Sequence, residues 1–278
     1  MLKTLRLSIF TPIAAAAFLT LASLGRIANA DPIASPAPSA SVSTTTTTAA
    51  PSPNARASAS LAPRNPESAI TPVEKDPKRH RQFLDRIKQG GIDLLFIGDS
   101  ITDFWNRVGE KSWLDFAPYH PANFGISGDA TEHVIWRLTH GELDGIHPKV
   151  AVVMIGTNNF GRFRDEQPEW VAAGIKKILD LIHEKIPETK VLLLAIFPRE
   201  DKPGAQGQQI RENIAKTNQI IAGYADGKRT RFLDIGKVFL DENGKIPSEI
   251  MPDKLHPSMF GYDRWYDAMK PTLDEMMK

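Results

Sequence analysis

The sequence contains no cysteine in 278 residues, so no disulfide can stabilise the fold and a buried core must do so alone. It also lacks an excess of either charge, with 34 basic and 33 acidic side chains, which does not suit a nucleic-acid-binding protein. Nor is a metal site indicated. His133 and His140 are seven residues apart rather than four, and no His-Glu-x-x-His motif occurs. We therefore expect neither a nucleic-acid partner nor a bound metal.

The first thirty residues have the pattern of a secretory signal peptide. Lys3 and Arg6 give a positive start, residues 7–24 are mostly apolar, and Ala28-Asn29-Ala30 fits a cleavage site. An uncleaved membrane anchor is the alternative, because eighteen apolar-leaning residues approach spanning length. The pattern predicts export to the periplasm or outside, with a membrane tether if the signal stays. Cleavage would leave 31 basic and 33 acidic side chains, a net charge of −2.

A linker and a single domain are predicted after the signal. Residues 31–72 are rich in Pro, Ser, Thr and Ala and almost lack large apolar side chains, so they cannot offset their ordering entropy and are predicted to be a disordered linker. Residues 73–278 have the length of one domain. The linker either spaces this domain from a membrane or wall or has no function of its own.

The predicted domain alternates short apolar runs with stretches of helical periodicity. Runs that are apolar on both faces indicate buried parallel strands, and their alternation with helices predicts a doubly wound α/β sandwich with three layers. The predicted strands are 94–97, 122–124, 150–155, 191–196 and 231–235, and the predicted helices are 78–89, 130–140, 168–186, 208–222 and 258–277.

Two short segments after the first two strands could supply a nucleophile and an oxyanion donor. Ser100 follows the first strand and opens a helical stretch, where its free N–H and the positive helix end would stabilise an adjacent anion. Gly128 follows the second strand, and a glycine lets a backbone N–H approach a substrate oxygen closely. Taken singly, Asp99-Ser100 could be a helix cap and Gly128 a turn glycine.

Polar residues after the third strand and before the last helix could complete the site. The amide of Asn158 could reach the same oxygen because neighbouring strand ends share one crevice, whereas we assign Asn159 a structural role. Asp253 and His256 are three residues apart, a spacing that lets the carboxylate orient the ring toward Ser100. Each segment alone could have a purely structural role, but the ordered set predicts a serine esterase.

Four cations that follow the third and fourth strands are candidates for the mouth of this crevice. They could meet a polar or acidic leaving group, or form a solvated rim. These residues are Arg162, Arg164, Arg199 and Lys202.

The segments resemble the SGNH/GDSL hydrolase family over residues 93–278. Ser100, Gly128, Asn158 and His256 match its four named positions, and Asp253 matches its acid. More specific stretches resemble the catalytic subunits of platelet-activating-factor acetylhydrolase Ib and their bacterial relatives. These stretches are 123–131, 134–138, 141–143 and 197–199.

The resemblance implies a flavodoxin-like parallel sheet of five strands in the order 2-1-3-4-5, no cofactor, and short acyl esters as substrates. The partner would be a small acylated molecule such as an acetylated sugar or a lipid ester. A longer-chain lipase, lysophospholipase or thioesterase stays an alternative, as does a carbohydrate- or wall-binding module with an inactive site. The sequence leaves the oligomeric state open, a homodimer included.

Overall fold

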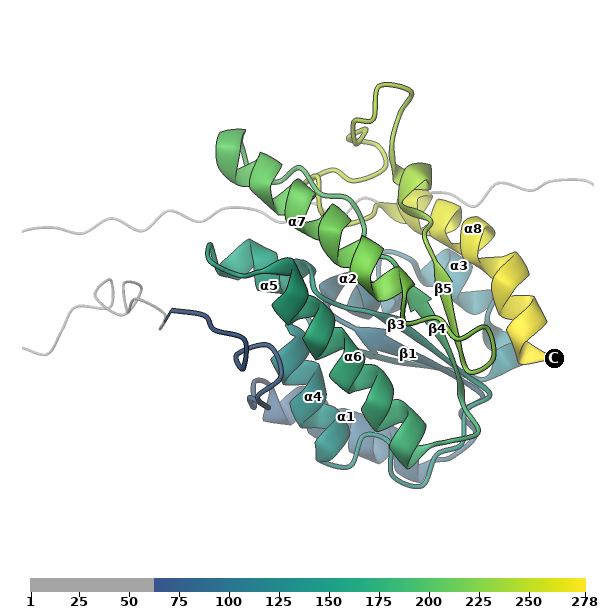
Figure 1. The fold of residues 1–278 in the computed structure, drawn as a ribbon. Helices are drawn as coiled ribbons and strands as arrows, with labels where there is room; N and C mark the ends of the chain where they lie inside the picture. The colour runs from purple at the N-terminus through teal and green to yellow at the C-terminus, as the bar shows by residue number, and fades with distance from the viewer. Residues whose placement is uncertain (1–62) are drawn as a thin grey trace, which may run out of the picture. The chain divides into compact units, whose positions relative to one another are not determined.

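A parallel sheet of five strands forms the centre of the computed structural model, which describes residues 63–278 (Figure 1). The strand order is β2-β1-β3-β4-β5 and every pair is parallel. The α/β class and the order 2-1-3-4-5 are thus confirmed. The strands are β1 (Leu94–Gly98), β2 (Pro121–Gly125), β3 (Val150–Met154), β4 (Lys190–Leu194) and β5 (Thr230–Leu233).

Helices cover both faces of this sheet, which gives the three layers. One face carries α1 (Pro77–Lys88), α4 (Thr131–Thr139), α6 (Pro168–Lys185) and α7 (Gly204–Ala222). The other carries the short η2 (Phe104–Asn106), α3 (Glu110–Leu114) and η3 (Ala117–Tyr119), then η4 (Gly236–Phe239) and the long α8 (Met259–Met277).

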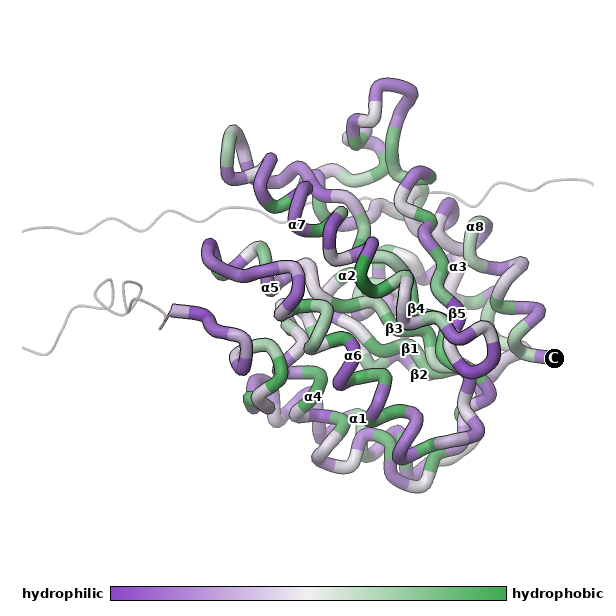
Figure 2. The backbone as a smooth tube through the Cα atoms, viewed as in Figure 1, coloured by the Kyte–Doolittle hydropathy of each residue, from purple (hydrophilic) through white to green (hydrophobic). Residues whose placement is uncertain are grey.

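The strands are apolar because both of their faces are buried. Leu95 and Ile97 of β1 point into the core under α1, α4, α6 and α7, while Leu94 and Phe96 point into the core under α8. In Figure 2 the strands β1, β3 and β4 are largely hydrophobic, whereas the helices around them mix hydrophilic and hydrophobic residues. Two cores that share one sheet bury enough apolar surface to fold a chain without disulfides.

The connection between β1 and β2 was not predicted in detail. It contains short helices rather than one long crossover helix, and its aromatic side chains pack on the sheet. Trp105 is fully buried and its ring contacts Phe96, Phe116 and Trp265 of α8. Such packing, more than local helix propensity, holds short helices in place.

Ordered contacts begin earlier than the domain boundary at residue 73. Ala69 is completely buried and its carbonyl accepts a hydrogen bond from Thr131, and Arg64 pairs with Glu132 and Glu166. Residues 63–72 are therefore packed on the domain and are not part of a disordered linker. The predicted signal peptide, and linker residues 31–62, lie outside the described residues.

The carboxyl ends of the neighbouring strands β2, β1 and β3 lie at one edge of the sheet. There β1 leads into α2 (Ser100–Asp103), β2 into the loop that holds Gly128, and β3 into α5 (Thr157–Arg162). Open parallel sheets place their ligand sites at this edge. Within residues 63–278, no helix combines the length and the apolarity needed to cross a bilayer.

Candidate active site

Ser100 begins α2 immediately after β1. The Asp99 side chain caps this helix by accepting a hydrogen bond from the N–H of Ile101 at 3.0 Å. A side chain at Gly98 would collide with Thr102 and the Met154 carbonyl, so the tight strand-to-helix turn requires glycine there. Only 7% of Ser100 is exposed, so neighbouring residues cover most of its surface.

The Ser100 hydroxyl is joined to a histidine and a carboxylate from the other end of the domain. Its Oγ lies 2.9 Å from Nε2 of His256, and Nδ1 of the same ring lies 2.6 Å from Oδ2 of Asp253. A carboxylate only accepts, so Nδ1–H donates to Asp253 and Nε2 is free to accept from the Ser100 O–H. The predicted trio lies in one hydrogen-bonded chain.

The loop that carries Asp253 and His256 is held by the aspartate itself. Its Oδ1 accepts from the backbone N–H of Leu255 at 3.1 Å and of His256 at 2.7 Å, and the intervening Lys254 has a left-handed φ of 61°. Partial burial opposes the charge of Asp253, but the His256 N–H, the His256 ring and the Leu255 N–H outweigh it and lower the pKa of this carboxyl. The ring of Phe104 stacks on His256 with centroids 5.1 Å apart, which also restricts the imidazole.

Two backbone donors and one amide lie around the same edge. Gly128 has a φ of 78°, a conformation that other residues rarely adopt. Within residues 63–278, the N–H groups of Ser100 and Gly128 have no protein acceptor. The Nδ2 of Asn158 donates to the Asp129 carbonyl at 2.9 Å, which leaves its second hydrogen for another oxygen.

A buried carboxyl, that of Asp99, directly precedes Ser100 in the chain. Asp99 is 1% exposed, and burial raises its pKa to about 7, with the negative charge of Asp129 adding to the rise and the Ile101 N–H and Arg199 opposing it. The second oxygen of Asp99, Oδ2, has no hydrogen-bond partner within residues 63–278.

One of the four cations considered for the crevice mouth is internal. Arg199 is 4% exposed, donates to Thr157 and forms a two-point ion pair with Asp201. Its charge is neutralised inside the domain, so it is not part of a solvated rim. Arg162 is exposed, and its Nη1 donates to the Gly128 carbonyl at 2.9 Å.

Sequence reasoning missed a buried charge network beneath Gly128. Arg137 is fully buried; its Nε pairs with Asp129 at 3.0 Å and its Nη1 pairs with Glu142. Lys75 pairs with the other oxygen of Asp129 at 3.1 Å. An arginine within the apolar pattern of α4 was the available signal, because a buried arginine needs carboxylate partners.

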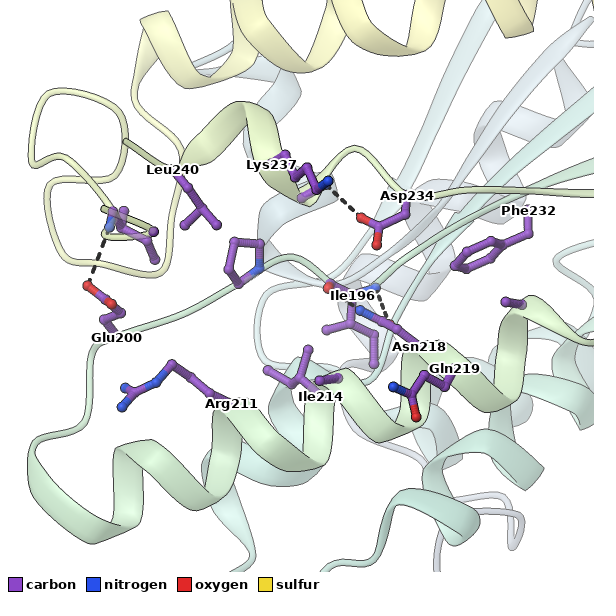
Figure 3. Close-up of a pocket in the computed structure, with 16 residues that line it drawn as sticks. Ile196, Glu200, Arg211, Ile214, Asn218, Gln219, Phe232, Asp234, Lys237 and Leu240 are labelled. Carbon is purple, nitrogen blue, oxygen red and sulfur yellow. Dashed lines mark hydrogen bonds between the residues drawn. The ribbon is translucent and has the colours of Figure 1, made fainter. Parts of the chain in front are cut away.

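A cavity near this edge of the sheet does not include Ser100. It has a volume of about 530 Å³ and lies between α7 and the segment that follows β5, with Ile196, Ile214 and Leu240 among its lining residues (Figure 3). The Glu200 side chain lines it, while the Glu200 N–H donates at 2.8 Å to the Lys254 carbonyl, in the loop that carries Asp253 and His256.

The fold is that of a family of ester hydrolases. The chain belongs to the GDSL-like lipase/acylhydrolase family, whose model matches residues 96–264. It is therefore a carboxylic ester hydrolase, and the resemblance noted in the sequence is confirmed.

Within this family, the chain is similar to several named proteins. The platelet-activating factor acetylhydrolase IB subunit alpha1 of Homo sapiens is 36% identical over 206 residues, which cover 71% of this chain and 85% of the relative. A structure described as a putative platelet activating factor from Streptococcus pneumonia is 25% identical with a TM-score of 0.59, covering 70% of this chain and 91% of the other. A putative acylhydrolase from Bacteroides fragilis shares the fold, with a TM-score of 0.61 and 18% identity, covering 74% of this chain and 100% of the other.

Proposed function

We propose that this chain is an exported serine esterase that hydrolyses short-chain oxygen esters, acetyl esters above all. One observation carries the proposal. The Ser100 hydroxyl lies 2.9 Å from His256 Nε2, and the opposite nitrogen of that ring lies 2.6 Å from Asp253. A hydroxyl, a base and an orienting carboxylate in this order are the arrangement that serine hydrolases use.

The mechanism follows from these roles. His256 takes the proton of Ser100 as its oxygen attacks the ester carbonyl, and Asp253 keeps the ring in the required tautomer. The N–H groups of Ser100 and Gly128 and the amide of Asn158 stabilise the tetrahedral oxyanion. His256 returns its proton to the leaving alcohol, an acyl-Ser100 intermediate forms, and water activated by His256 releases the acid.

Two features support a short acyl group. The relatives at 36–38% identity bear the name acetylhydrolase. Ser100 is also only 7% exposed, while the cavity of about 530 Å³ beside α7 is lined by none of Ser100, Gly128, Asn158 or His256. A long acyl chain would need an apolar channel beside the nucleophile.

The decisive test measures hydrolysis of p-nitrophenyl acetate by Ser100→Ala and His256→Ala. Each variant should lose at least about a thousandfold in kcat. Ser248→Ala and His147→Ala change the same residue types at exposed positions and should keep wild-type turnover. Wild-type turnover in Ser100→Ala would disprove the proposed mechanism.

The acyl preference and the export are tested separately. Along a series of p-nitrophenyl esters, kcat/KM should be highest for the C2 to C4 acyl groups, and a maximum at C8 or longer would contradict the short-acyl proposal. Cleavage after Ala30 predicts that the exported protein begins at Asp31, which N-terminal sequencing of the protein from the cell exterior or periplasm would detect.

A further inference from the structure

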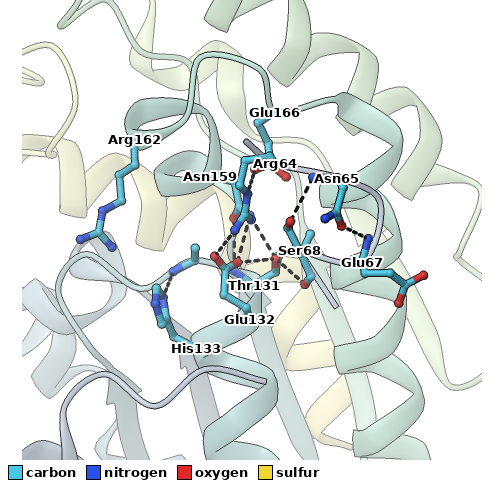
Figure 4. Close-up of polar contacts among 12 residues, drawn as sticks. Arg64, Asn65, Glu67, Ser68, Thr131, Glu132, His133, Asn159, Arg162 and Glu166 are labelled. Atoms are coloured by element: carbon cyan, nitrogen blue, oxygen red, sulfur yellow. Dashed lines mark hydrogen bonds and ion pairs between the residues drawn. The ribbon is translucent and has the colours of Figure 1, made fainter. Parts of the chain in front are cut away.

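Residues 63–76 cross the side of the site where the proposed oxyanion donors lie. Arg64 is at one end of this segment, and its Nε donates to Glu166 at 2.5 Å while its Nη1 donates to Glu132 at 2.9 Å (Figure 4). Its guanidinium also stacks on the Phe163 ring, 4.1 Å from the centroid. Both glutamates are almost fully buried and come from different parts of the domain, so Arg64 joins the start of α4 to the loop before α6.

Glu132 links the loop that carries the Gly128 N–H to the turn that carries the Asn158 amide. Its Oε2 accepts from Asn159 Nδ2 at 3.2 Å, and Asn159 Oδ1 accepts from the Thr131 N–H at 3.1 Å. Thr131 follows Gly128 by three residues and Asn159 follows Asn158 directly. Figure 4 shows these side chains gathered around Arg64. The network fixes the Gly128 loop relative to the Asn158 turn.

Lys75, at the other end of the segment, contacts the Gly128 loop directly. Its Nζ donates to the Ser127 carbonyl at 2.5 Å and pairs with Asp129 at 3.1 Å. In a trans peptide the C=O of one residue and the N–H of the next point in opposite directions. Holding the Ser127 carbonyl outward therefore holds the Gly128 N–H in the opposite direction.

The carbonyls of three successive residues in this loop are all held by side chains. Lys75 binds that of Ser127, Arg162 binds that of Gly128, and Asn158 binds that of Asp129. A loop whose peptide planes are fixed in this way has little reorganisation left to make when negative charge develops nearby.

We propose that residues 63–76 form an oxyanion clamp, in which Lys75 and Arg64 are positioning residues for the Gly128 N–H and the Asn158 amide. The proposal rests on the proposed function, because an oxyanion forms only if Ser100 attacks an ester. Neither residue touches the substrate. Their effect is confined to the aim of donors that act most strongly in the transition state, so losing them lowers kcat and leaves KM almost unchanged.

The test uses Lys75→Met in the full chain, with steady-state kinetics on p-nitrophenyl acetate. Removing an oxyanion donor costs about 10²–10³ in kcat, and loosening one that stays in place should cost about tenfold or more. Lys75→Arg keeps a cation that can reach the same carbonyl and should recover most of the loss. Lys78→Met, an exposed change of the same type three residues along, should have wild-type kcat.

Arg64→Gln is a second variant that tests the other end of the clamp. It acts one step further from the donors, so kcat should fall by a few-fold, measured well below the melting temperature of the variant because buried Glu132 and Glu166 lose their partner.

The outcomes separate the clamp from the proposed function. If Ser100→Ala is inactive while Lys75→Met keeps kcat within about twofold of wild type, the clamp is wrong and the esterase proposal stands. A rise in KM at constant kcat, or an equal loss in Lys78→Met, also overturns the clamp. If Ser100→Ala is fully active, the proposed function itself fails.

Discussion

At the scale of single residues, Asp99 both caps α2 and places an ionisable carboxyl in the protein interior. One of its oxygens caps α2 and so places Ser100, while the other is buried without a partner within residues 63–278. Burial raises the pKa of Asp99 to about 7. A carboxyl whose pKa is higher in the folded state than in the unfolded chain makes stability fall as pH rises between the two values.

This sign gives a test of the buried charge. From about pH 4 to pH 7 the unfolded chain loses the Asp99 proton while the folded protein keeps it, which should cost on the order of 4 kcal/mol of unfolding free energy. Asp99→Asn keeps an oxygen for the Ile101 N–H but cannot ionise, so its advantage over wild type should grow across this range and then level off. Urea unfolding at several pH values measures it.

The control is Asp85→Asn, at an exposed position of α1. Its unfolding free energy should follow that of wild type at every pH. Parallel curves for Asp99→Asn and wild type would show that the buried carboxyl carries no such cost.

A substitution at Gly128 is expected to change both the stability of the protein and kcat, for two different physical reasons. Replacing it with alanine places a Cβ 3.5 Å from the Lys75 ammonium and forces a non-glycine residue to a φ of 78°. We expect about 1 kcal/mol of lost stability together with a fall in kcat of about tenfold or more, because the donor N–H shifts as the strain relaxes.

Gly227→Ala is the matched control, since Gly227 has a φ of 67° and open space around it, far along the chain from the site. It should show a similar loss of stability with unchanged kcat. Equal kinetics in the two alanine variants would contradict the role given to the Gly128 N–H.

At the scale of elements, the strands were predictable to within a few residues, whereas several short helices were not. Val150–Met154 is apolar on both faces because both faces are covered, so its residue pattern is sufficient. Glu110–Leu114, in contrast, is a helix of five residues, and the flanking Trp105 packs on Trp265 of α8, far along the chain. Contacts of this kind join distant parts of the chain and leave no local periodicity.

The candidate site residues could be selected from the sequence because each lies just beyond a strand end or in a short loop with a characteristic spacing. The polar residues that hold them could not. Arg64 finds Glu166 more than a hundred positions along the chain, and composition alone placed it in a linker. Lys75 and Asp129 are separated in the same way, by 54 residues.

The loop that holds His256 is an element whose aspartate has two separable tasks. Oδ2 of Asp253 faces the ring, while Oδ1 accepts from two backbone N–H groups. Asp253→Asn preserves an oxygen for the backbone and loses the charge, while Asp253→Ala loses both. We expect kcat/KM on p-nitrophenyl acetate to fall by at least about a hundredfold in Asp253→Asn and further in Asp253→Ala.

Asp253→Asn, which keeps the backbone hydrogen bonds of the turn, should therefore be more active than Asp253→Ala. Equal rates in the two variants would mean that the backbone hydrogen bonds of Oδ1 contribute nothing, and wild-type rates in Asp253→Ala would remove Asp253 from the catalytic group.

At the scale of the whole molecule, the order of the strands explains why residues far apart in the sequence share one site. Placing β1 between β2 and β3 brings the ends of three strands side by side, so Ser100, Gly128 and Asn158 converge. The last loop before α8 then closes over them with His256. Segment 63–76 packs against this arrangement from outside the sheet. Truncation from the N-terminus can therefore show which of these residues the activity requires.

Two truncated chains make this test. Chains 63–278 and 77–278 both retain every strand and the Ser100, His256 and Asp253 side chains, but only the longer one retains Arg64, Ala69 and Lys75. The longer chain should keep the kcat of the full protein within about twofold. The shorter one should lose about tenfold or more in kcat and melt at a lower temperature, because Glu132, Glu166 and Asp129 lose cations and the apolar contact of Ala69 disappears. Thermal unfolding and p-nitrophenyl acetate kinetics on both chains measure this, and equal kcat in the two would mean that the Gly128 loop keeps its geometry without residues 63–76.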